Sequence, residues 1–366
     1  MKVKPIIHLI CAARPNFMKV APLYHELLRQ GWGRPLLVHT GQHYDANMSA
    51  DILADLNLPE PDIYLDIGSG THAEQTAGVM LAYEKVCLAD PPDYIVVVGD
   101  VNSTMAVTIT AKKLLLPVAH LEAGLRSGDR TMPEEINRIV TDALCDLLWT
   151  PSPDADENLR REGVPEERIA RVGNIMMDAY EMMREKISAD PILTDLGLPS
   201  RSYGLVTLHR PSNVDQMETL HPLVDSLQAV ARELKLVFPV HPRTRQRLQT
   251  FGLWSQLEQN ESIILLEPVS YIPFMAMVQH ARLVITDSGG IQEETTYLGI
   301  PCLTLRPNTE RPITILEGTN QLSTADRLVR QVQDILENPM RTHTRPALWD
   351  GKTAGRVIEN LKTILD

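Results

Sequence analysis

The segment from Asp287 to Glu294, which reads DSGGIQEE, combines residue types that suit phosphate binding. It follows LVIT, an apolar run typical of a buried strand, and precedes a helical pattern. Glycine lets the backbone approach a ligand closely, and free N–H groups at a helix start favour a phosphate. Ser288 adds a hydroxyl donor, and Glu294 is placed to accept hydrogen bonds from ribose hydroxyls. The segment predicts a nucleotide-diphosphate site, although DSGG alone could equally form a tight turn.

Polar side chains also follow most of the other expected strands. They are Arg14, Lys19, Gln42, His43, Asp100 and Glu122 in the first half of the chain, and His209, Arg210, His241, Arg243, Arg306, Glu310 and Arg311 in the second. Taken singly, each has an ordinary explanation: Asp100 could cap a following helix, and His241 could be a satisfied, partly buried histidine. Ligands of open parallel sheets bind beyond the carboxyl ends of the strands. The recurrence in both halves therefore favours a binding cleft.

Two series of strands and helices must position these residues. The expected strands are 6–12, 35–41, 94–100, 117–123 and 147–152, then 203–210, 235–242, 262–268, 282–288 and 301–307. Helical patterns occupy 103–114, 219–234, 291–299, 327–339 and 353–366. Strands that are apolar on both faces and separated by helices are typical of parallel sheets covered on both sides. We expect an α/β protein with two doubly wound, Rossmann-like domains facing a central cleft.

The segment 171–202 contains no strand of this kind and separates the two series, so we expect the junction near residue 173. The expected domains are 1–172, which carries the carboxylates Asp100 and Glu122, and 173–352, which carries the nucleotide site. The amphipathic helix 353–366 is expected to pack back on the first domain. A chain of 366 residues is long enough for two domains, because single cores usually stop growing near 250–300 residues.

Composition excludes several classes of function. The net charge of −12 argues against a general nucleic-acid binder. The four cysteines are far apart and form no C-x-x-C pair, so we expect reduced core thiols and neither disulfides nor a zinc site. The N-terminal apolar run is short for a signal peptide, and no run approaches the roughly 20 residues of a membrane span. We expect a cytoplasmic protein with no membrane association.

Motifs along nearly the whole chain resemble those of the non-hydrolysing UDP-N-acetylglucosamine 2-epimerases, which have a glycosyltransferase-B type fold. These motifs include ARPNFMK (13–19), TGQH (40–43), VVGDVNST (97–104), HLEAGLRSGD (120–129), PEEINR (133–138), TLHR (207–210), DSGGIQEE (287–294) and TERP (309–312). The resemblance implies inversion of UDP-N-acetylglucosamine at C2, through elimination of UDP to a 2-acetamidoglucal and re-addition of UDP. It implies no cofactor, a UDP-sugar as the bound partner, and a homodimer.

The resemblance also implies roles for individual residues. The catalytic positions match Asp100, Glu122, Glu134 and His209, with Glu135 as the alternative to Glu134. Positions that bind the UDP-sugar match Arg14, Lys19, His241, Phe274, Ser288, Gly289, Gly290, Glu294 and Arg311. Gln42, His43 and Gln75 match positions that bind a second substrate molecule as an activator in some bacterial members. Asp45 and Glu74 replace a glutamine and an arginine of that activator site.

Asp100 and Glu122 are 22 residues apart, which fits one β–α–β unit and would place both carboxylates at one edge of the sheet. Close carboxylates separate their pKa values, so that one can act as an acid and the other as a base. We expect them to transfer protons at C2 and O3 of the sugar.

Other functions stay open on the sequence alone. They are a glycosyltransferase of the same fold, a hydrolysing epimerase, a catalytically inactive nucleotide-sugar sensor, and a 2-epimerase of a modified sugar such as a diacetamido-glucuronate. Several carboxylates in the first half favour an epimerase, because a transferase typically needs one base. A sensor is disfavoured because the matched catalytic positions are all intact; they are Asp100, Glu122, Glu134 and His209.

Overall fold

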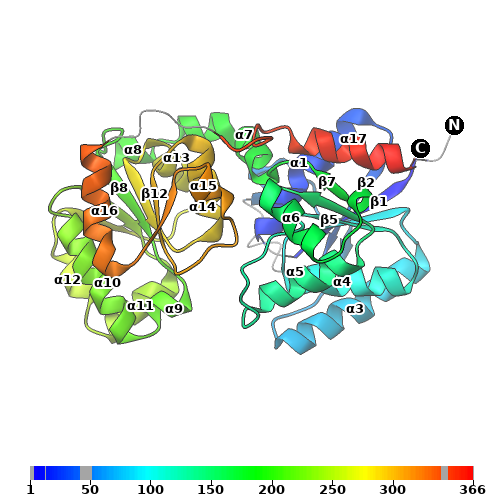
Figure 1. Cartoon of the computed structure of the whole chain (residues 1–366), viewed down its shortest axis with the longest axis horizontal. Coiled ribbons are helices and arrows are strands. Elements are labelled where there is room, and N and C mark those ends of the chain that lie inside the picture. The colour runs from blue at the N-terminus through cyan, green and yellow to red at the C-terminus, as the bar shows by residue number, and fades with distance from the viewer. Residues whose placement is uncertain (1–3, 13, 42–51, 339–344, 366) are drawn as a thin grey trace. The chain divides into compact units, whose positions relative to one another are not determined.

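The computed structural model describes residues 4–12, 14–41, 52–338 and 345–365, and the chain divides into two compact units. Unit 1 comprises Met1–Met183 and Ala347–Asp366, and unit 2 comprises Arg184–Pro346. Each unit contains one sheet between helices (Figure 1). The boundary falls inside α7 (Ile175–Ala189), whereas the sequence pattern placed the junction before this helix, near residue 173.

The sheet of unit 1 has seven strands in the order β3-β2-β1-β4-β5-β6-β7, and all of its pairings are parallel. The strands are β1 (Ile6–Cys11), β2 (Arg34–His39), β3 (Ile63–Tyr64), β4 (Tyr94–Val98), β5 (Val118–Leu121), β6 (Leu147–Thr150) and β7 (Ile169–Arg171). The central strands β1, β4 and β5 consist of apolar residues apart from His8 and His120, and all of their residues except Ile6 are buried, because helices cover both faces.

The helices of unit 1 form two layers (Figure 1). On one face, α3, α4 and α5 pack in that order, and on the other α1 packs against α17. The helices are α1 (Arg14–Gln30), α3 (His72–Ala89), α4 (Asn102–Lys113), α5 (Pro133–Leu144), α6 (Pro153–Arg161), α7 (Ile175–Ala189) and α17 (Thr353–Leu365), with a 3₁₀ turn η1 (Glu166–Arg168). The C-terminal helix therefore lies in unit 1.

The sheet of unit 2 has six parallel strands in the order β10-β9-β8-β11-β12-β13. They are β8 (Tyr203–Thr207), β9 (Lys235–Pro239), β10 (Ile263–Leu266), β11 (Leu283–Thr286), β12 (Cys302–Leu305) and β13 (Asn320–Ser323). One core cluster joins inner residues of β8, β9, β10, β11 and β12 to α10 and α16.

The helices of unit 2 also lie on both faces of the sheet (Figure 1). α10 packs against α16 on one face, and α14 packs against α13 and α15 on the other. The helices are α8 (Ile192–Asp195), α9 (Pro211–Val214), α10 (Met217–Val230), α11 (Pro242–Thr250), α12 (Trp254–Glu258), α13 (Tyr271–His280), α14 (Gly289–Leu298), α15 (Ile313–Leu316) and α16 (Ala325–Glu337).

The ten expected strands are all present, and the structure adds β3, β7 and β13. β3 has two residues, β7 is a short, partly exposed edge strand, and β13 has the polar sequence NQLS. None of the three carries the apolar run by which the other strands were predicted. The α/β class with two parallel sheets is confirmed.

Strand register places the functional loops in pairs. Val98 lies opposite Leu121, so the segments after β4 and β5, which carry Asp100 and Glu122, leave the sheet at the same edge. Thr207 lies opposite Thr286, so His209 and Asp287 leave the second sheet side by side. Both pairs occupy the carboxyl edge, where ligands of parallel sheets bind. None of the helices within the described residues combines the length and apolar composition that a membrane crossing requires.

Candidate active site

Asp100 follows β4 and is held by two residues of α5. Arg138 Nη1 lies 2.5 Å from Asp100 Oδ2, and the Asn137 side chain donates to the Asp100 carbonyl oxygen at 2.8 Å. Arg138 is buried, whereas the Asp100 side chain keeps 36% of its surface exposed. A carboxylate that is oriented by a buried guanidinium and still accessible is suited to exchange a proton with a ligand.

Glu122 follows β5, and only 5% of its surface is exposed. Its Oε2 accepts a charge-assisted hydrogen bond from Lys19 Nζ on α1. Its Oε1 is buried and has no hydrogen-bond partner among the described residues. An unpaired buried acceptor is costly, so Oε1 marks a position where a ligand group or a proton completes the hydrogen bonding. Lys19, expected at the UDP-sugar, therefore contacts a carboxylate that the sequence predicts to be catalytic.

The adjacent glutamates of α5 have opposite environments. Glu135 is buried and accepts hydrogen bonds from the amides of Ser127 and Gly128 at 3.0 and 2.9 Å and from Arg138 at 2.6 Å. Burial alone would raise the pKa of Glu135, but these amides and the Arg138 guanidinium outweigh it and lower the pKa. Glu134 is exposed and makes no such contact within the described residues. Of the pair, Glu134 is the one available to a ligand.

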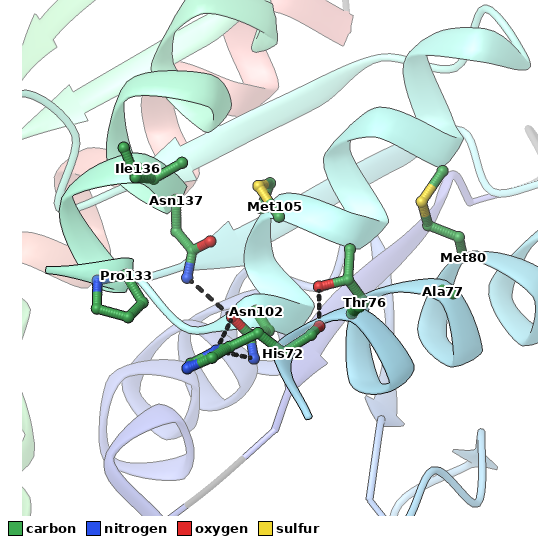
Figure 2. A pocket seen from close by; sticks show the side chains of 10 residues that line it. His72, Thr76, Ala77, Met80, Asn102, Met105, Pro133, Ile136 and Asn137 are labelled. Atoms are coloured by element: carbon green, nitrogen blue, oxygen red, sulfur yellow. Dashed lines mark hydrogen bonds between the residues drawn. The ribbon is translucent and has the colours of Figure 1, made fainter. Parts of the chain in front are cut away.

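Gln75 on α3 connects to Asp100 through two asparagines. Asn102 donates to Gln75 Oε1 at 2.9 Å, and Asn137 donates to Asn102 Oδ1 at 3.3 Å. A groove of about 490 Å³ lies beside this network. In Figure 2, Pro133 and Ile136 lie on one side of the view and Met80 on the other, with His72 and Asn102 between them. Gln42 and His43, the other expected activator positions, lie outside the described residues.

Asp287 organises the polar groups at the edge of the second sheet. It is fully buried and accepts from the amides of His209 and Arg210 at 3.0 and 2.9 Å. His209 Nδ1 lies 2.9 Å from Asp287 Oδ1, and 43% of the His209 side chain is exposed. Burial alone would raise the pKa of Asp287, but the hydrogen bond and charge of His209 and the two amides lower it. The ionised carboxylate orients the histidine so that Nε2 remains for a ligand.

His241 lies beside His209, with their ring centroids 5.8 Å apart. Its Nδ1 accepts a hydrogen bond from the Arg243 amide at 3.2 Å, which caps α11. Burial, and then the charge of His209, lower the pKa of His241. The neutral ring therefore carries its proton on Nε2 and can donate it to an anion.

The N-terminus of α14 provides the expected phosphate-binding geometry. Ser288 is the N-cap residue, but its side chain makes no capping hydrogen bond. A Cβ on Gly290 would meet no atom within 4 Å, whereas a Cβ on Gly289 would lie 2.7 Å from Glu310 Oε1. The uncapped amides and the dipole of this ten-residue helix suit a negatively charged group beside Gly290.

Arg311 lies at this helix terminus and is oriented by acidic residues. Its Nε is 2.8 Å from Glu293 Oε1, and its Nη1 is 2.8 Å from Glu310 Oε1. Burial alone would raise the pKa of Glu310, but Arg311 and Arg306 lower it to about 2. Glu310 therefore stays ionised, and together with Glu293 it holds the guanidinium next to Gly289.

The remaining expected contacts are distributed as follows. Glu294 is buried in α14, and its Oε1 accepts from the hydroxyl of Tyr271 at 2.9 Å. Phe274 is half-buried on α13, the helix that supplies Tyr271. α1 begins at Arg14, whose side chain lies outside what the structure describes. Within the described residues, no three His, Cys, Asp or Glu side chains are grouped as metal ligands.

Sequence reasoning did not assign the residues that orient the candidate catalytic groups. Arg138, Asn137 and Tyr271 received no role, and Asp287 was noted only as a polar strand end. The spacing of Glu135 and Arg138, three residues apart on one helix face, was an available signal. The contact between Asp287 and His209 joins positions 78 residues apart, and only the pairing of β8 with β11 reveals it.

Residues 25–362 match the family model described as UDP-N-acetylglucosamine 2-epimerase. The chain belongs to the UDP-N-acetylglucosamine 2-epimerase family. Among its relatives, the UDP-N-acetylglucosamine 2-epimerase of Methanocaldococcus jannaschii is 40% identical, over 97% of this chain and 98% of that protein. The UDP-2,3-diacetamido-2,3-dideoxy-D-glucuronate 2-epimerase of Pseudomonas aeruginosa is 36% identical, over 99% of each.

A solved structure of a family member is similar throughout. It is the Methanocaldococcus jannaschii UDP-GlcNAc 2-epimerase in complex with UDP-GlcNAc and UDP, with a TM-score of 0.88 and 39% identity. The match covers 98% of this chain and 99% of that one. Both units of the chain therefore have the fold of this epimerase family.

Proposed function

We propose that this protein is an isomerase that interconverts UDP-N-acetylglucosamine and UDP-N-acetylmannosamine by inverting C2. Membership of the epimerase family supports this reaction. In the first step a base removes the C2 proton, the electron pair forms a C1=C2 bond, and the C1–O bond breaks so that UDP leaves. In the second step a UDP oxygen attacks C1 and a proton is added to the opposite face of C2. No redox change occurs in either step.

Unit 1 supplies the proton-transfer groups of this proposal. Asp100, Glu122 and Glu134 are the carboxylates available for it, because Glu135 is already saturated by amides and Arg138. The observation that carries the proposal is the buried Glu122 Oε1, an acceptor that lacks a partner while Lys19 keeps Oε2 occupied. Such a carboxylate is a general base in position before the substrate arrives.

Unit 2 binds UDP in this proposal. The uncapped amides of Gly289 and Gly290, with Ser288, take the diphosphate, and Arg311 lies beside them. His209, oriented by Asp287, donates from Nε2 to the departing phosphate oxygen, and His241 donates from its own Nε2. Preorganised donors of this kind stabilise the charge that develops on a leaving group. Glu294 accepts from the ribose, and Phe274 lies near the uracil.

The test is proton NMR of the purified protein with UDP-N-acetylglucosamine in D₂O. We expect UDP-N-acetylmannosamine to appear with deuterium at C2, and recovered substrate to gain deuterium as well. Release of free sugar and UDP would show a hydrolase instead. Absence of any C2 exchange with this sugar would refute the proposed substrate.

A second substrate has specific support from the Pseudomonas aeruginosa relative, which is 36% identical. If UDP-N-acetylglucosamine shows no exchange, the same assay with UDP-2,3-diacetamido-2,3-dideoxy-D-glucuronate tests it. Exchange at C2 of only the second sugar would keep the reaction type and change the substrate.

We also propose that two copies associate through α3. Leu81 and Leu88 are 63% and 69% exposed and lie seven residues apart, and therefore on one side of the helix. Their burial would contribute about 25 cal/mol per Å² of apolar surface. Sedimentation analysis should give a dimer for the wild type and a monomer for Leu81→Glu. A monomeric wild type would exclude this association.

We further propose that the protein acts in the cytoplasm. Its four cysteines are buried and unpaired, as they are in a reducing compartment. Cell fractionation tests this location.

A further inference from the structure

His120, the third residue of β5, is fully buried, and both of its ring nitrogens face acceptors. Nδ1 lies 2.6 Å from Asp142 Oδ1 on α5, and Nε2 lies 2.8 Å from the carbonyl oxygen of Gly99. A carboxylate and a carbonyl can only accept, so both nitrogens must donate. The ring is therefore an imidazolium that ties α5 to the residue immediately before Asp100.

Asp142 extends this connection to the turn that follows Glu122. Its Oδ2 accepts from the amide of Gly124 at 3.0 Å and lies 2.7 Å from Arg126 Nη1. Burial alone would raise the pKa of Asp142, but the charge and hydrogen bond of His120, and then Arg126, lower it. The ionised carboxylate therefore holds the imidazolium with one oxygen and the turn with the other.

This turn has a backbone conformation that needs support. Glu122 has a φ of 73°, in the left-handed region that non-glycine residues rarely adopt. The carbonyl oxygen of Trp149 accepts from the amides of Glu122 and Ala123, both at 3.1 Å, and Asp142 then holds the amide of Gly124. Unusual conformations persist where the surroundings over-determine them, and they cluster at functional sites.

We propose that His120 and Asp142 are positioning residues that fix the loop bearing Asp100 and the turn bearing Glu122 relative to each other. The proposal deepens the proposed function and rests on it, because it takes these two carboxylates as the proton-transfer groups. His120 contacts neither carboxylate; it acts through the Gly99 carbonyl and, by way of Asp142, through the Gly124 amide. Its loss should slow proton transfer more than it weakens binding, because UDP is held by unit 2.

A merely stabilising role would not require this pair. Replacing a buried ion pair by apolar residues of similar volume is often neutral or stabilising. A neutral histidine, in turn, would have only one N–H and would leave either Asp142 or the Gly99 carbonyl without a donor. Only a ring that donates from both nitrogens can bind the Gly99 carbonyl after β4 and, through Asp142, the turn after β5 at the same time.

Two substitutions separate the two contacts of the ring. In His120→Asn the amide nitrogen stands near the Nδ1 position and keeps the Asp142 contact, whereas in His120→Gln it stands near the Nε2 position and keeps the Gly99 contact. We expect kcat of H120N to fall about 10²-fold, with KM changing by less than about threefold, because misplacement of about 1 Å has this effect on rate. We expect kcat of H120Q to be at least about tenfold higher than kcat of H120N.

A second buried histidine provides the matched control. His8 on β1 is 1% exposed, and its Nδ1 lies 3.0 Å from the Tyr83 hydroxyl, in a contact that reaches neither strand end. His8→Asn should lower the unfolding temperature and leave kcat unchanged. Equal kcat losses in H120N and H120Q, or a loss in H8N of the same size, would overturn the positioning role.

Asp142→Asn decides the question if H120N does not fold, because it keeps the shape but removes one of the two acceptors. We expect kcat of D142N to fall with little change in KM, and wild-type kcat in folded D142N would overturn the proposal. A crystal structure of H120N or D142N should show the Gly99 carbonyl or the Gly124 amide displaced. This structural result is independent of the substrate, so an inactive wild type would refute the proposed function without deciding the positioning role.

Discussion

At the scale of single residues, substitution of the two adjacent glutamates of α5 should have opposite effects on activity and stability. Glu134→Gln should lower kcat about 10²- to 10⁴-fold without changing stability, as expected for loss of a general acid or base. Glu135→Gln should lower the free energy of unfolding by about 1–3 kcal/mol, because buried amides and Arg138 lose a charged partner. Steady-state kinetics and urea unfolding of both variants measure the difference. Activity loss without destabilisation in E135Q would instead make Glu135 the catalytic member.

Gly290 tests the phosphate site without disturbing the fold. An alanine Cβ would meet no protein atom within 4 Å, and alanine suits a helix better than glycine by about 1 kcal/mol. Gly290→Ala should therefore keep or raise the unfolding temperature while weakening UDP binding at least about tenfold, because the methyl group occupies the ligand's place. Calorimetric titration with UDP measures the affinity. Wild-type affinity would place the diphosphate elsewhere.

Residue types alone predicted the groups that have chemistry but not the groups that orient them. Asp100, Glu122 and His209 stand at strand ends, where a pattern in the sequence is enough to find them. Their partners Arg138, Lys19 and Asp287 are 38, 103 and 78 positions away, and only the packing of the sheet brings them near. The expected roles of the site residues stay predictions until the variants above are measured.

At the scale of elements, the turn after β5 allows a comparison of two glycines with similar φ. Gly124 has a φ of 80° and Gly128 a φ of 73°, but a Cβ on Gly124 would lie 2.3 Å from the Ala155 carbonyl oxygen, whereas one on Gly128 would meet nothing. Gly128→Ala should cost about 1 kcal/mol from conformation alone. Gly124→Ala should cost more than about 3 kcal/mol, because backbone must move as well. Thermal unfolding of the two variants compares these losses of stability. Equal losses would show that α6 shifts to accommodate the added methyl group without further cost.

Elements were predictable where burial is complete. β4 reads YIVVV and is buried throughout, and its start was predicted to the residue. β13 reads NQLS, and its polar Asn320 can be buried because Thr304 and Gln292 form hydrogen bonds with its side chain. These partners are distant in sequence, so no local sequence pattern predicts the strand. Strand ends were placed one to three residues too far, because the expected ranges included the polar residues that follow each apolar run.

At the scale of the whole molecule, α17 is attached to unit 1 by Asp178 on α7. The two oxygens of Asp178 accept from the amides of Thr353 and Ala354 at 3.0 and 2.8 Å. Asp178→Ala removes both contacts, so hydrogen exchange should become faster in α17 and in α1 beneath it, and stay unchanged in unit 2. Asp178→Asn, which keeps one acceptor, should have a smaller effect. Unchanged exchange in α17 would show that its apolar face alone holds it.

The stability of unit 1 should depend on pH through His8. Burial lowers the pKa of His8 from 6.5 to about 4, outweighing Asp90 and Asp62, which raise it. The unfolded state therefore binds the proton more readily than the folded state does. The contribution of neutral His8 to the free energy of unfolding is fully present above pH 6.5, and it is lost as the pH falls towards 4. The difference is about 3 kcal/mol. Denaturant unfolding across this range should show the loss in the wild type and a flatter profile in H8N; parallel profiles would exclude it.

The return of the chain to unit 1 has a consequence for biosynthesis. Unit 1 is assembled from two stretches separated by Arg184–Pro346, which form unit 2 without interruption. A ribosome that adds about 5–20 residues per second needs roughly 10–30 s to make the intervening stretch. During that time the face of α1 that α17 covers has no partner, while all of unit 2 emerges. Unit 2 is therefore able to fold before unit 1 is complete. Until α17 has been made, the apolar face of α1 has to be shielded from water by something other than its native partner.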